Sequence, residues 1–331
     1  RRETRRLMAR NRYYDGPVSD HYDGLRFFVP GGPPDKSLGE LWRMLRDSRT
    51  KREPWPQNPP ILPCPTPPAR VDGLRVTLIG HSTFLIQTQG VNLLTDPVFA
   101  ERAGPWGWIG PKRATPPALR LEDLPPLDAI LLSHNHYDHM DLATLARLAP
   151  TRVLTPLGND AILRNHDSRI EAQALDWGQS TQVGPLRVTC EPAMHWSARG
   201  RGDRRMALWG SFMLTGEAGA VYFAGDTGYG DGALFPQIAA RHAPIRLALI
   251  PIGAYAPRWF MRDQHCDPNE ALAIFQSLRA ETAFACHWGT FRLTDEPYDE
   301  PPRRLAEALA KAGIAAERFV APPPGGGLEV G

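Results

Sequence analysis

The sequence predicts an α/β fold in which two β-sheets form a sandwich covered by helices. Short apolar runs separated by glycine and polar residues have the length and composition of strands, and they recur along the chain after about residue 73. Segments with helical spacing of apolar residues lie between and after these runs. Strands that come first, with helices interspersed and later, are typical of such a layered architecture.

Residues 1–72 are expected to form an N-terminal extension with a proline-rich arm. Residues 38–45 carry apolar side chains at positions i, i+3, i+4 and i+7, which predicts a short helix. The chain contains 34 prolines, concentrated between Pro54 and Pro68, where neither a helix nor an inner strand can continue. We therefore expect a linker or wrapping arm before a main domain of residues 73–331.

Within the main domain, glycines such as Gly80 and Gly90 separate the predicted strands. Asp267 followed by Pro268 predicts the start of a helix, because Asp is a good N-cap and Pro fits the first helical position. The predicted strands are 75–79, 83–87, 91–94, 129–132, 152–155, 186–190, 208–214, 220–223, 247–250 and 282–285. The predicted helices are 142–148, 160–165, 268–278 and 302–312.

The composition is that of a globular protein, with 42% hydrophobic and 22% charged residues among 331. A formal net charge of +2 does not suggest a nucleic-acid partner. Four cysteines without a CxxC pair are expected to be buried thiols, which favours a reducing compartment. Six arginines lie close together at the amino terminus: Arg1, Arg2, Arg5, Arg6, Arg10 and Arg12. We expect this segment either to be solvated or to contact an anionic or membrane surface.

No apolar run approaches the roughly 18 to 20 residues that span a bilayer, so no transmembrane helix is predicted. The sequence does not begin with Met, which leaves open a removed targeting or anchor segment. The location favoured is cytoplasmic or peripheral to a membrane.

The most informative motif is residues 133–139, Ser-His-Asn-His-Tyr-Asp-His, directly after the apolar run 129–132. It places His134, His136, Asp138 and His139 in one turn after a predicted strand. Imidazole and carboxylate donors are those that zinc and similar divalent metals take. The chain has only ten histidines, so three within six residues point to a metal site.

Three further donors each follow a predicted strand, as a two-metal centre requires. His195 comes after strand 186–190, Asp226 after 220–223, and His287 after 282–285. The turn after Asp226 contains Gly228, which lets the backbone approach a ligand closely.

The His-x-His-x-Asp-His spacing, with these three later donors in order, resembles the metallo-β-lactamase superfamily and its αββα sandwich. The resemblance implies that Asp226 bridges two divalent metal ions, and that a hydroxide between the ions is the nucleophile. It also implies that Asp138 orients that water and takes up a proton. Zinc is our first choice, with Mn and Fe as alternatives. One ion would be held by His134, His136 and His195, and the other by Asp138, His139 and His287.

Two residues on neighbouring predicted strands are candidates for supporting roles. Asp96 is expected to accept the outer N–H of a ligating imidazole, which fixes its tautomer. His81 is expected to lie in such a supporting position or near the substrate. A plain structural role fits both equally well.

Outside these donors, the chain from about His21 to about Pro302 resembles the N-acyl phosphatidylethanolamine phospholipase D family. That resemblance implies a phospholipid or other phosphodiester substrate, cleaved to phosphatidic acid and an N-acyl ethanolamine. His265 is a candidate for a catalytic proton donor or polar contact. Candidate substrate-binding residues on the loop around Pro257 are Tyr255, Arg258, Trp259, Gln264 and His265. The resemblance rests on residues 21–24, 96–99, 110–113, 134–141, 195–196, 208–211, 225–229, 251–255, 257–261 and 287–291.

Two groups of side chains on predicted loops could contact a lipid substrate or a membrane surface. The alternative is that the apolar group packs under the loops and that the basic group is simply solvated. The apolar groups are Trp106, Trp108, Ile109, Trp259, Phe260 and Met261, and the basic ones are Arg199, Arg201, Arg204 and Arg205.

Two other functions stay open. A lactonase or other carboxylic-ester hydrolase would use the same metal donors with a smaller, neutral pocket. A non-catalytic binding protein of the same fold would usually lack metal donors, and none is missing here. A nucleic-acid phosphodiesterase would need a broad basic surface, which is not evident.

Overall fold

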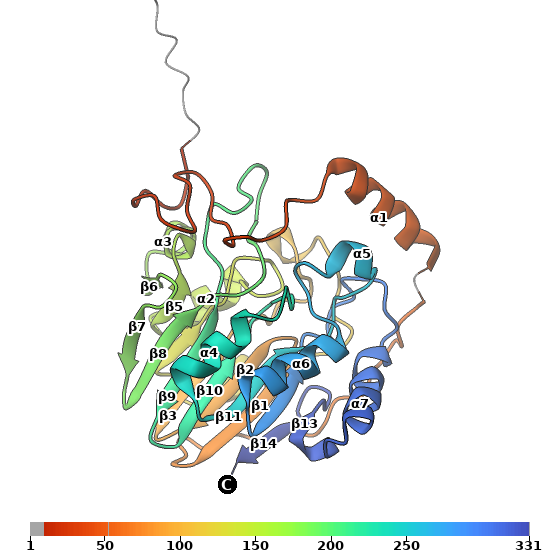
Figure 1. Ribbon diagram of the computed structural model, residues 1–331. Coiled ribbons are helices and arrows are strands. Elements are labelled where there is room, and N and C mark those ends of the chain that lie inside the picture. The colour runs from red at the N-terminus through yellow and green to blue at the C-terminus, as the bar shows by residue number, and fades with distance from the viewer. Residues whose placement is uncertain (1–9, 52, 331) are drawn as a thin grey trace, which may run out of the picture.

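The computed structural model describes residues 10–51 and 53–330. Arg1, Arg2, Arg5 and Arg6 of the predicted arginine cluster lie outside this range. Two seven-stranded sheets pack face to face, with helices on their outer sides (Figure 1). The first sheet has the order β14 (Gly327–Val330), β1 (Leu74–Gly80), β2 (Thr83–Thr88), β3 (Val91–Thr95), β4 (Ala129–Leu131), β5 (Val153–Pro156) and β6 (Ala172–Leu175). The second has β13 (Phe319–Val320), β12 (Thr282–Cys286), β11 (Ile245–Pro251), β10 (Gly219–Phe223), β9 (Ser211–Gly216), β8 (Leu186–Glu191) and β7 (Ser180–Val183).

The main hydrophobic core lies between the two sheets. Phe84 of β2 and Phe284 of β12 meet there edge to face, with ring centroids 5.3 Å apart. Val76 and Phe212 belong to the same buried cluster. The inner strands offer one face to this core and the other to a helical layer, so their apolar runs are nearly continuous.

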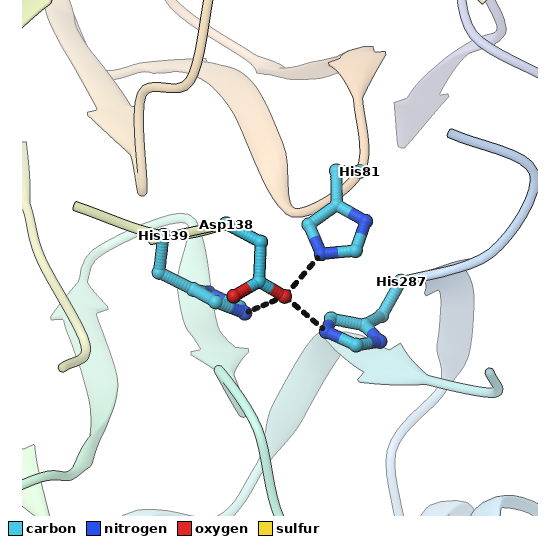
Figure 2. A group of neighbouring side chains, drawn as sticks. All are labelled: His81, Asp138, His139 and His287. Carbon is cyan, nitrogen blue, oxygen red and sulfur yellow. Dashed lines mark hydrogen bonds and ion pairs between the residues drawn. The ribbon is translucent and has the colours of Figure 1, made fainter. Parts of the chain in front are cut away.

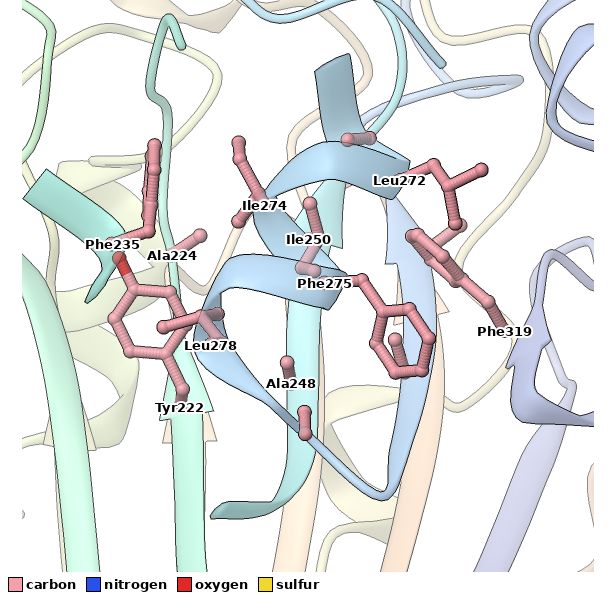
Figure 3. Packing of buried hydrophobic residues seen from close by; sticks show 14 of the residues in the cluster. Tyr222, Ala224, Phe235, Ala248, Ile250, Leu272, Ile274, Phe275, Leu278 and Phe319 are labelled. Carbon is pink, nitrogen blue, oxygen red and sulfur yellow. The ribbon is translucent and has the colours of Figure 1, made fainter. Parts of the chain in front are cut away.

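Helices cover the outer face of each sheet. Helices α2 (Leu142–Leu148) and α3 (Asn159–His166) pack on the first sheet through Leu145 and Leu163. The second sheet is covered by α4 (Leu234–His242), α6 (Pro268–Leu278) and α7 (Glu300–Ala312). Figure 3 shows α6 packed over β10 and β11. Asp267 and Glu270 form a capping box at the start of α6, which confirms the predicted helix start.

The N-terminal part packs against the sandwich. Tyr22 and Phe27 join Trp209 in a buried cluster. Helix α1 (Leu38–Lys51) lies at the periphery, near the one-turn helix α5 (Arg258–Met261) (Figure 1). Residues 53–73 contain neither helix nor strand, as the prolines predict. The boundary at residue 72 stays a prediction. Among the described residues, no helix combines the length and the apolar character needed to cross a membrane.

Several sequence predictions need correction. The strand predicted at 208–214 begins at Ser211, because the Gly210 N–H donates to the Ser133 carbonyl and the Trp209 side chain turns into the N-terminal cluster. Elements β6, β7, α4, α5, β13 and β14 were not predicted, because they are short or carry an internal proline, as α4 does. Three cysteines are buried as expected, but Cys64 is partly exposed.

Candidate metal centre

The loops that leave four strands meet at one end of the sandwich. The segment after β4 carries His134 to His139, and the loop after β8 carries His195. Asp226 follows β10 and His287 follows β12. The structure therefore brings together all seven donors that the sequence suggested, in two neighbouring clusters of buried or half-buried side chains.

The first cluster consists of His134, His136, His195 and Asp226, whose donor atoms lie within 4.8 Å of one another. The Nδ1 atom of His136 is 2.9 Å from Nε2 of His134 and 3.2 Å from Nε2 of His195. The Oδ2 atom of Asp226 lies 3.7 Å from Nε2 of His195. Three imidazole nitrogens thus converge beside one carboxylate.

The second cluster consists of His81, Asp138, His139 and His287, and Figure 2 shows its side chains pointing at one another. Asp226 reaches this cluster too. Its Oδ1 atom is 3.1 Å from Nε2 of His287, and its Oδ2 atom is 3.2 Å from Nε2 of His139. Asp226 therefore lies between the clusters. The sequence singled out His81 for a supporting position, a place near the substrate or a plain structural role, and not as a metal donor.

Hydrogen bonds on the outer side hold several imidazoles in place. Asp96 Oδ2 lies 2.6 Å from Nδ1 of His139 and also accepts a hydrogen bond from the Ser133 hydroxyl, as predicted for Asp96. The Nδ1–H of His195 donates to the backbone carbonyl of Gln264 over 2.8 Å. Both contacts leave Nε2 free to face the cluster interior.

Burial and mutual proximity set the charge of these groups. Burial lowers the pKa of His81 to about 3, and it lowers the pKa of His134 well below its usual range, helped by neighbouring imidazoles. Burial alone would raise the pKa of Asp226, but His139 and His287 hold it well below its usual range. Burial alone would lower the pKa of His139 and of His287, but the charge of Asp226 raises both, to about 9 for His287.

Several of these buried atoms make no hydrogen bond among the described residues, namely Nε2 of His139, Nε2 of His287 and Oδ1 of Asp226. Burying such polar atoms without a partner is costly. A divalent cation in each cluster would satisfy them, and a nitrogen-rich donor set suits zinc and neighbouring metals. The residues present therefore fit a pair of metal ions.

Among the candidate substrate residues, His265 brings its imidazole ring up to the clusters. Its ring centroid is 5.0 Å from that of His195, and its Nδ1 atom is 3.9 Å from Oδ2 of Asp226. Nδ1 has no hydrogen-bond partner among the described residues. The Gln264 carbonyl accepts a hydrogen bond from His195. This is a backbone contact, which cannot be predicted from the type of side chain at position 264.

Three other candidates brace the loop. The Tyr255 hydroxyl donates to Glu300 over 2.6 Å, and it is buried. Arg258 donates to Glu270 over 2.7 Å and to the His265 carbonyl over 2.8 Å, so it supports His265 from behind. Trp259 is partly buried beneath the Arg43 guanidinium of α1, 4.7 Å from its ring centroid.

The two groups of bulky apolar residues differ in exposure. Phe260 and Met261 are buried in α5, so the predicted loop is a packed turn of helix, and of the two alternatives for these side chains the structure shows packing. Trp106 and Trp108 are 78% and 67% exposed. Only the second group forms a free apolar surface.

A hollow of about 480 Å³ opens beside His195 and Gln264. Its outer wall is formed by residues 28–36, for which the sequence carried no signal. Ion pairs tie this wall down, with Lys36 2.6 Å from Asp263 and Arg204 3.0 Å from Asp35.

The predicted basic run is largely engaged within the protein. Arg205 also pairs with Asp35, and Arg199 donates to the Met140 carbonyl. Arg201 is exposed. The run therefore helps to hold the loops around the clusters together.

Residues 91–288 match the family model described as "Beta-lactamase superfamily domain". The chain belongs to the beta-lactamase superfamily. Within it, the chain is 38% identical over 262 residues to "N-acyl-phosphatidylethanolamine-hydrolyzing phospholipase D 1" of Caenorhabditis elegans, covering 75% of this chain and 73% of the relative. It is 36% identical to "N-acyl-phosphatidylethanolamine-hydrolyzing phospholipase D, mitochondrial" of Saccharomyces cerevisiae, covering 75% of this chain and 54% of that relative.

A solved structure, an isothiocyanate hydrolase from Delia radicum gut bacteria, shares the fold with a TM-score of 0.63. The two chains are 20% identical, and the match covers 77% of this chain and 98% of the other. These findings confirm the predicted metallo-β-lactamase fold and the predicted hydrolase class. They also agree with a metal-dependent site, without indicating which metal.

Proposed function

We propose that this protein is a dinuclear metal-dependent phosphodiesterase. The observation that carries the proposal is that Asp226, a member of the first cluster, also lies 3.2 Å from His139 and 3.1 Å from His287 of the second, so one carboxylate can hold two ions close together. Two ions about 3.5–4 Å apart are the arrangement that supports hydrolysis of phosphate esters. Bound zinc ions would supply Lewis-acid chemistry, lowering the pKa of water and neutralising charge on a phosphoryl oxygen.

The proposed substrate is N-acyl phosphatidylethanolamine, cleaved by a phospholipase D-type reaction to phosphatidic acid and N-acyl ethanolamine. Both named relatives are phospholipases of this type, and the nematode protein is 38% identical to this chain. The whole-protein activity is part of the proposal, since this chain spans 73% of the nematode relative and 54% of the yeast relative.

Residues of the chain supply polar contacts to the substrate. Asp138 Oδ2 faces the interior of the second cluster, where it can orient water and accept a proton. His265 presents an unpartnered Nδ1 towards Asp226, available for a hydrogen bond to a substrate oxygen. Arg258 and the Gln264 carbonyl hold His265 and His195 in place.

Exposed aromatic side chains support a substrate that resides in a membrane. The rings of Trp106 and Trp108 stack 5.8 Å apart on a loop beside a hollow of about 910 Å³. Tyr137 and Met140, from the His134–Asp141 segment, line the same hollow. Indole rings are favoured at the boundary between water and lipid. We therefore propose a peripheral contact with the lipid surface at this loop.

The test is a comparison of zinc-loaded protein on N-acyl phosphatidylethanolamine, a short soluble phosphodiester and a lactone. We expect N-acyl ethanolamine and phosphatidic acid to appear in equal amounts, with slower turnover of the soluble diester. Cleavage of the lactone alone would overturn the proposal in favour of a carboxylic-ester hydrolase.

His265→Gln tests the contact assigned to His265. Loss of a hydrogen bond formed mainly in the transition state should lower kcat on the phosphodiester, with the metal content unchanged. His166→Gln removes an exposed imidazole from the end of α3, on the wall of the hollow of about 910 Å³. It is the matched control and should keep full turnover of the soluble diester, which does not need the lipid contact.

A further inference from the structure

His81 contributes a donor that the predicted set of seven lacks. It lies in the turn between β1 and β2, far in sequence from the His134–His139 segment. Its side chain is buried, and its Nε2 atom is 3.1 Å from Oδ2 of Asp138. His139 and His287 approach the same oxygen with Nε2, at 3.6 Å and 3.4 Å (Figure 2).

These three distances match the spacing of donors around one ion. Two donors bound 2.0–2.1 Å from a tetrahedral zinc lie about 3.4 Å apart. Hydrogen bonding alone does not explain the whole group. Nε2 of His139, at 3.6 Å, is too far from this oxygen for a hydrogen bond, and His139 is instead held by Asp96, 2.6 Å from its Nδ1 atom.

The backbone of His81 is held in an unfavourable conformation. Its φ is +52°, a left-handed value that is uncommon outside glycine, although His adopts it more often than most residues do. Two contacts impose it: the His81 N–H donates to the Thr290 hydroxyl over 2.8 Å, and its carbonyl accepts from the His287 N–H over 3.0 Å. Such strain persists when the surroundings over-determine it, and it gathers at functional sites.

The imidazole ring of His81 is also fixed from both sides. Its centroid lies 4.0 Å from that of His287 and 5.2 Å from that of Phe291. The two backbone contacts tie the ring to the same loop that carries His287. A side chain held this firmly can present Nε2 to a fixed point without losing further freedom.

We propose that His81 is a direct ligand of the second metal ion, together with Asp138, His139 and His287. The inference rests on the two-metal centre of the proposed function and adds one imidazole to it. The second ion then has three imidazoles, as the first does. His81 thereby links the β1–β2 turn of the first sheet to a centre otherwise built on β4, β8, β10 and β12.

The test uses Co²⁺ as the probe and metal retention and visible absorption as readouts. His81→Gly removes the imidazole and accepts the positive φ. We expect it to bind the second Co²⁺ at least tenfold more weakly and to change the absorption of that ion, while the first ion stays bound. Phe291→Leu, which alters the surroundings of the ring but removes no donor, is the matched control and should retain both ions.

Chemical rescue separates a ligand from a hydrogen-bond donor. Added 1-methylimidazole has a lone pair for the metal and no N–H, so it should restore the second Co²⁺ to His81→Gly as well as imidazole does. Restoration of the second Co²⁺ by imidazole but not by 1-methylimidazole would overturn the inference and make His81 a hydrogen-bond donor to Asp138. Unchanged affinity for the second ion in His81→Gly would overturn it as well.

A measurement on the wild-type protein covers the case in which the variant fails to fold. Paramagnetically shifted NMR signals of the Co²⁺ protein should come from six imidazoles, and five would contradict the inference. Failure of the proposed function gives a different pattern. Two bound ions without phosphodiesterase activity would leave the role of His81 intact, whereas fewer than two bound ions would overturn both.

Discussion

The Oδ2 atom of Asp96 lies 2.6 Å from Nδ1 of His139, and both side chains are fully buried. Asp96 also accepts hydrogen bonds from the backbone N–H and the hydroxyl of Ser133, over 2.7 Å and 2.6 Å. The carboxylate therefore ties the start of the His134–His139 segment to one of its donors. Its contact with Nδ1 sets which nitrogen of His139 faces the metal centre.

Asp96→Asn should weaken binding of the second ion about 10- to 100-fold, because the amide removes the charge that orients the imidazole of His139. Titration of the metal-depleted protein with zinc, followed by calorimetry, measures the effect. Asp128→Asn is the control, since that carboxylate accepts from the Asn92 N–H at a site remote from the clusters. Equal zinc affinity in the two variants would contradict the role assigned to Asp96.

Asp226→Asn should cost at least one metal ion per chain and lower the turnover rate on the order of a hundredfold, or roughly 3 kcal/mol of barrier. The amide keeps the shape of the side chain but removes the charge that both clusters share. Elemental analysis and turnover of a soluble phosphodiester test this. We expect two ions per chain in the wild type. A variant with two ions and full turnover would show that Asp226 does not bridge them.

Replacing both Trp106 and Trp108 with Ser should weaken binding to lipid vesicles about tenfold or more. Full burial of a large apolar side chain contributes about 1.5–3 kcal/mol. A ring that inserts only partly into the lipid contributes a fraction of that free energy. Sedimentation with vesicles measures binding, and turnover of a short soluble diester should not change. Leu62→Ser removes an exposed apolar side chain elsewhere and is the control. A loss of equal size on the soluble diester would mean that the tryptophans support the fold.

The buried carboxylate of Glu191 should make stability depend on pH. Burial would raise its pKa, but contacts with His242, at 2.7 Å, and with Arg241 bring it below the ordinary value of 4.5. A carboxylate whose pKa is lower in the folded state stabilises the fold above its unfolded pKa. That contribution is lost as the pH falls through the folded pKa.

Glu191→Gln should therefore lower the free energy of unfolding at pH 7 by about 1–3 kcal/mol. The difference from the wild type should shrink as the pH falls below 4.5. Urea unfolding at several pH values measures it, with the exposed Glu217→Gln as the control. A difference that stays constant into the acid range would rule out this ion pair as the cause.

Much of the fold and of the metal centre could be predicted from the sequence alone. Strand and helix periodicity indicated the layered sandwich, and Asp267 with Pro268 marked the start of α6. The donors of the His134–His139 segment are neighbours in sequence, so their proximity follows from a single turn. His195, Asp226 and His287 could be predicted because each lies within a few residues of a strand end, and strand ends gather at the edges of a sheet.

Only the tertiary structure decided which distant segments complete the centre. His81 meets Asp138 and His287 because the segments that follow β1, β4 and β12 come together at one end of the sandwich, across both sheets, and no local pattern encodes that meeting. The contact between Gln264 and His195 uses a backbone carbonyl, which every residue type has, so the sequence does not mark it. The burial of Phe260 likewise depends on contacts with distant parts of the chain. The sequence by itself determined the chemistry of the donors, because side-chain type sets it. The tertiary structure determined their partners, because packing brings together residues that are remote along the chain.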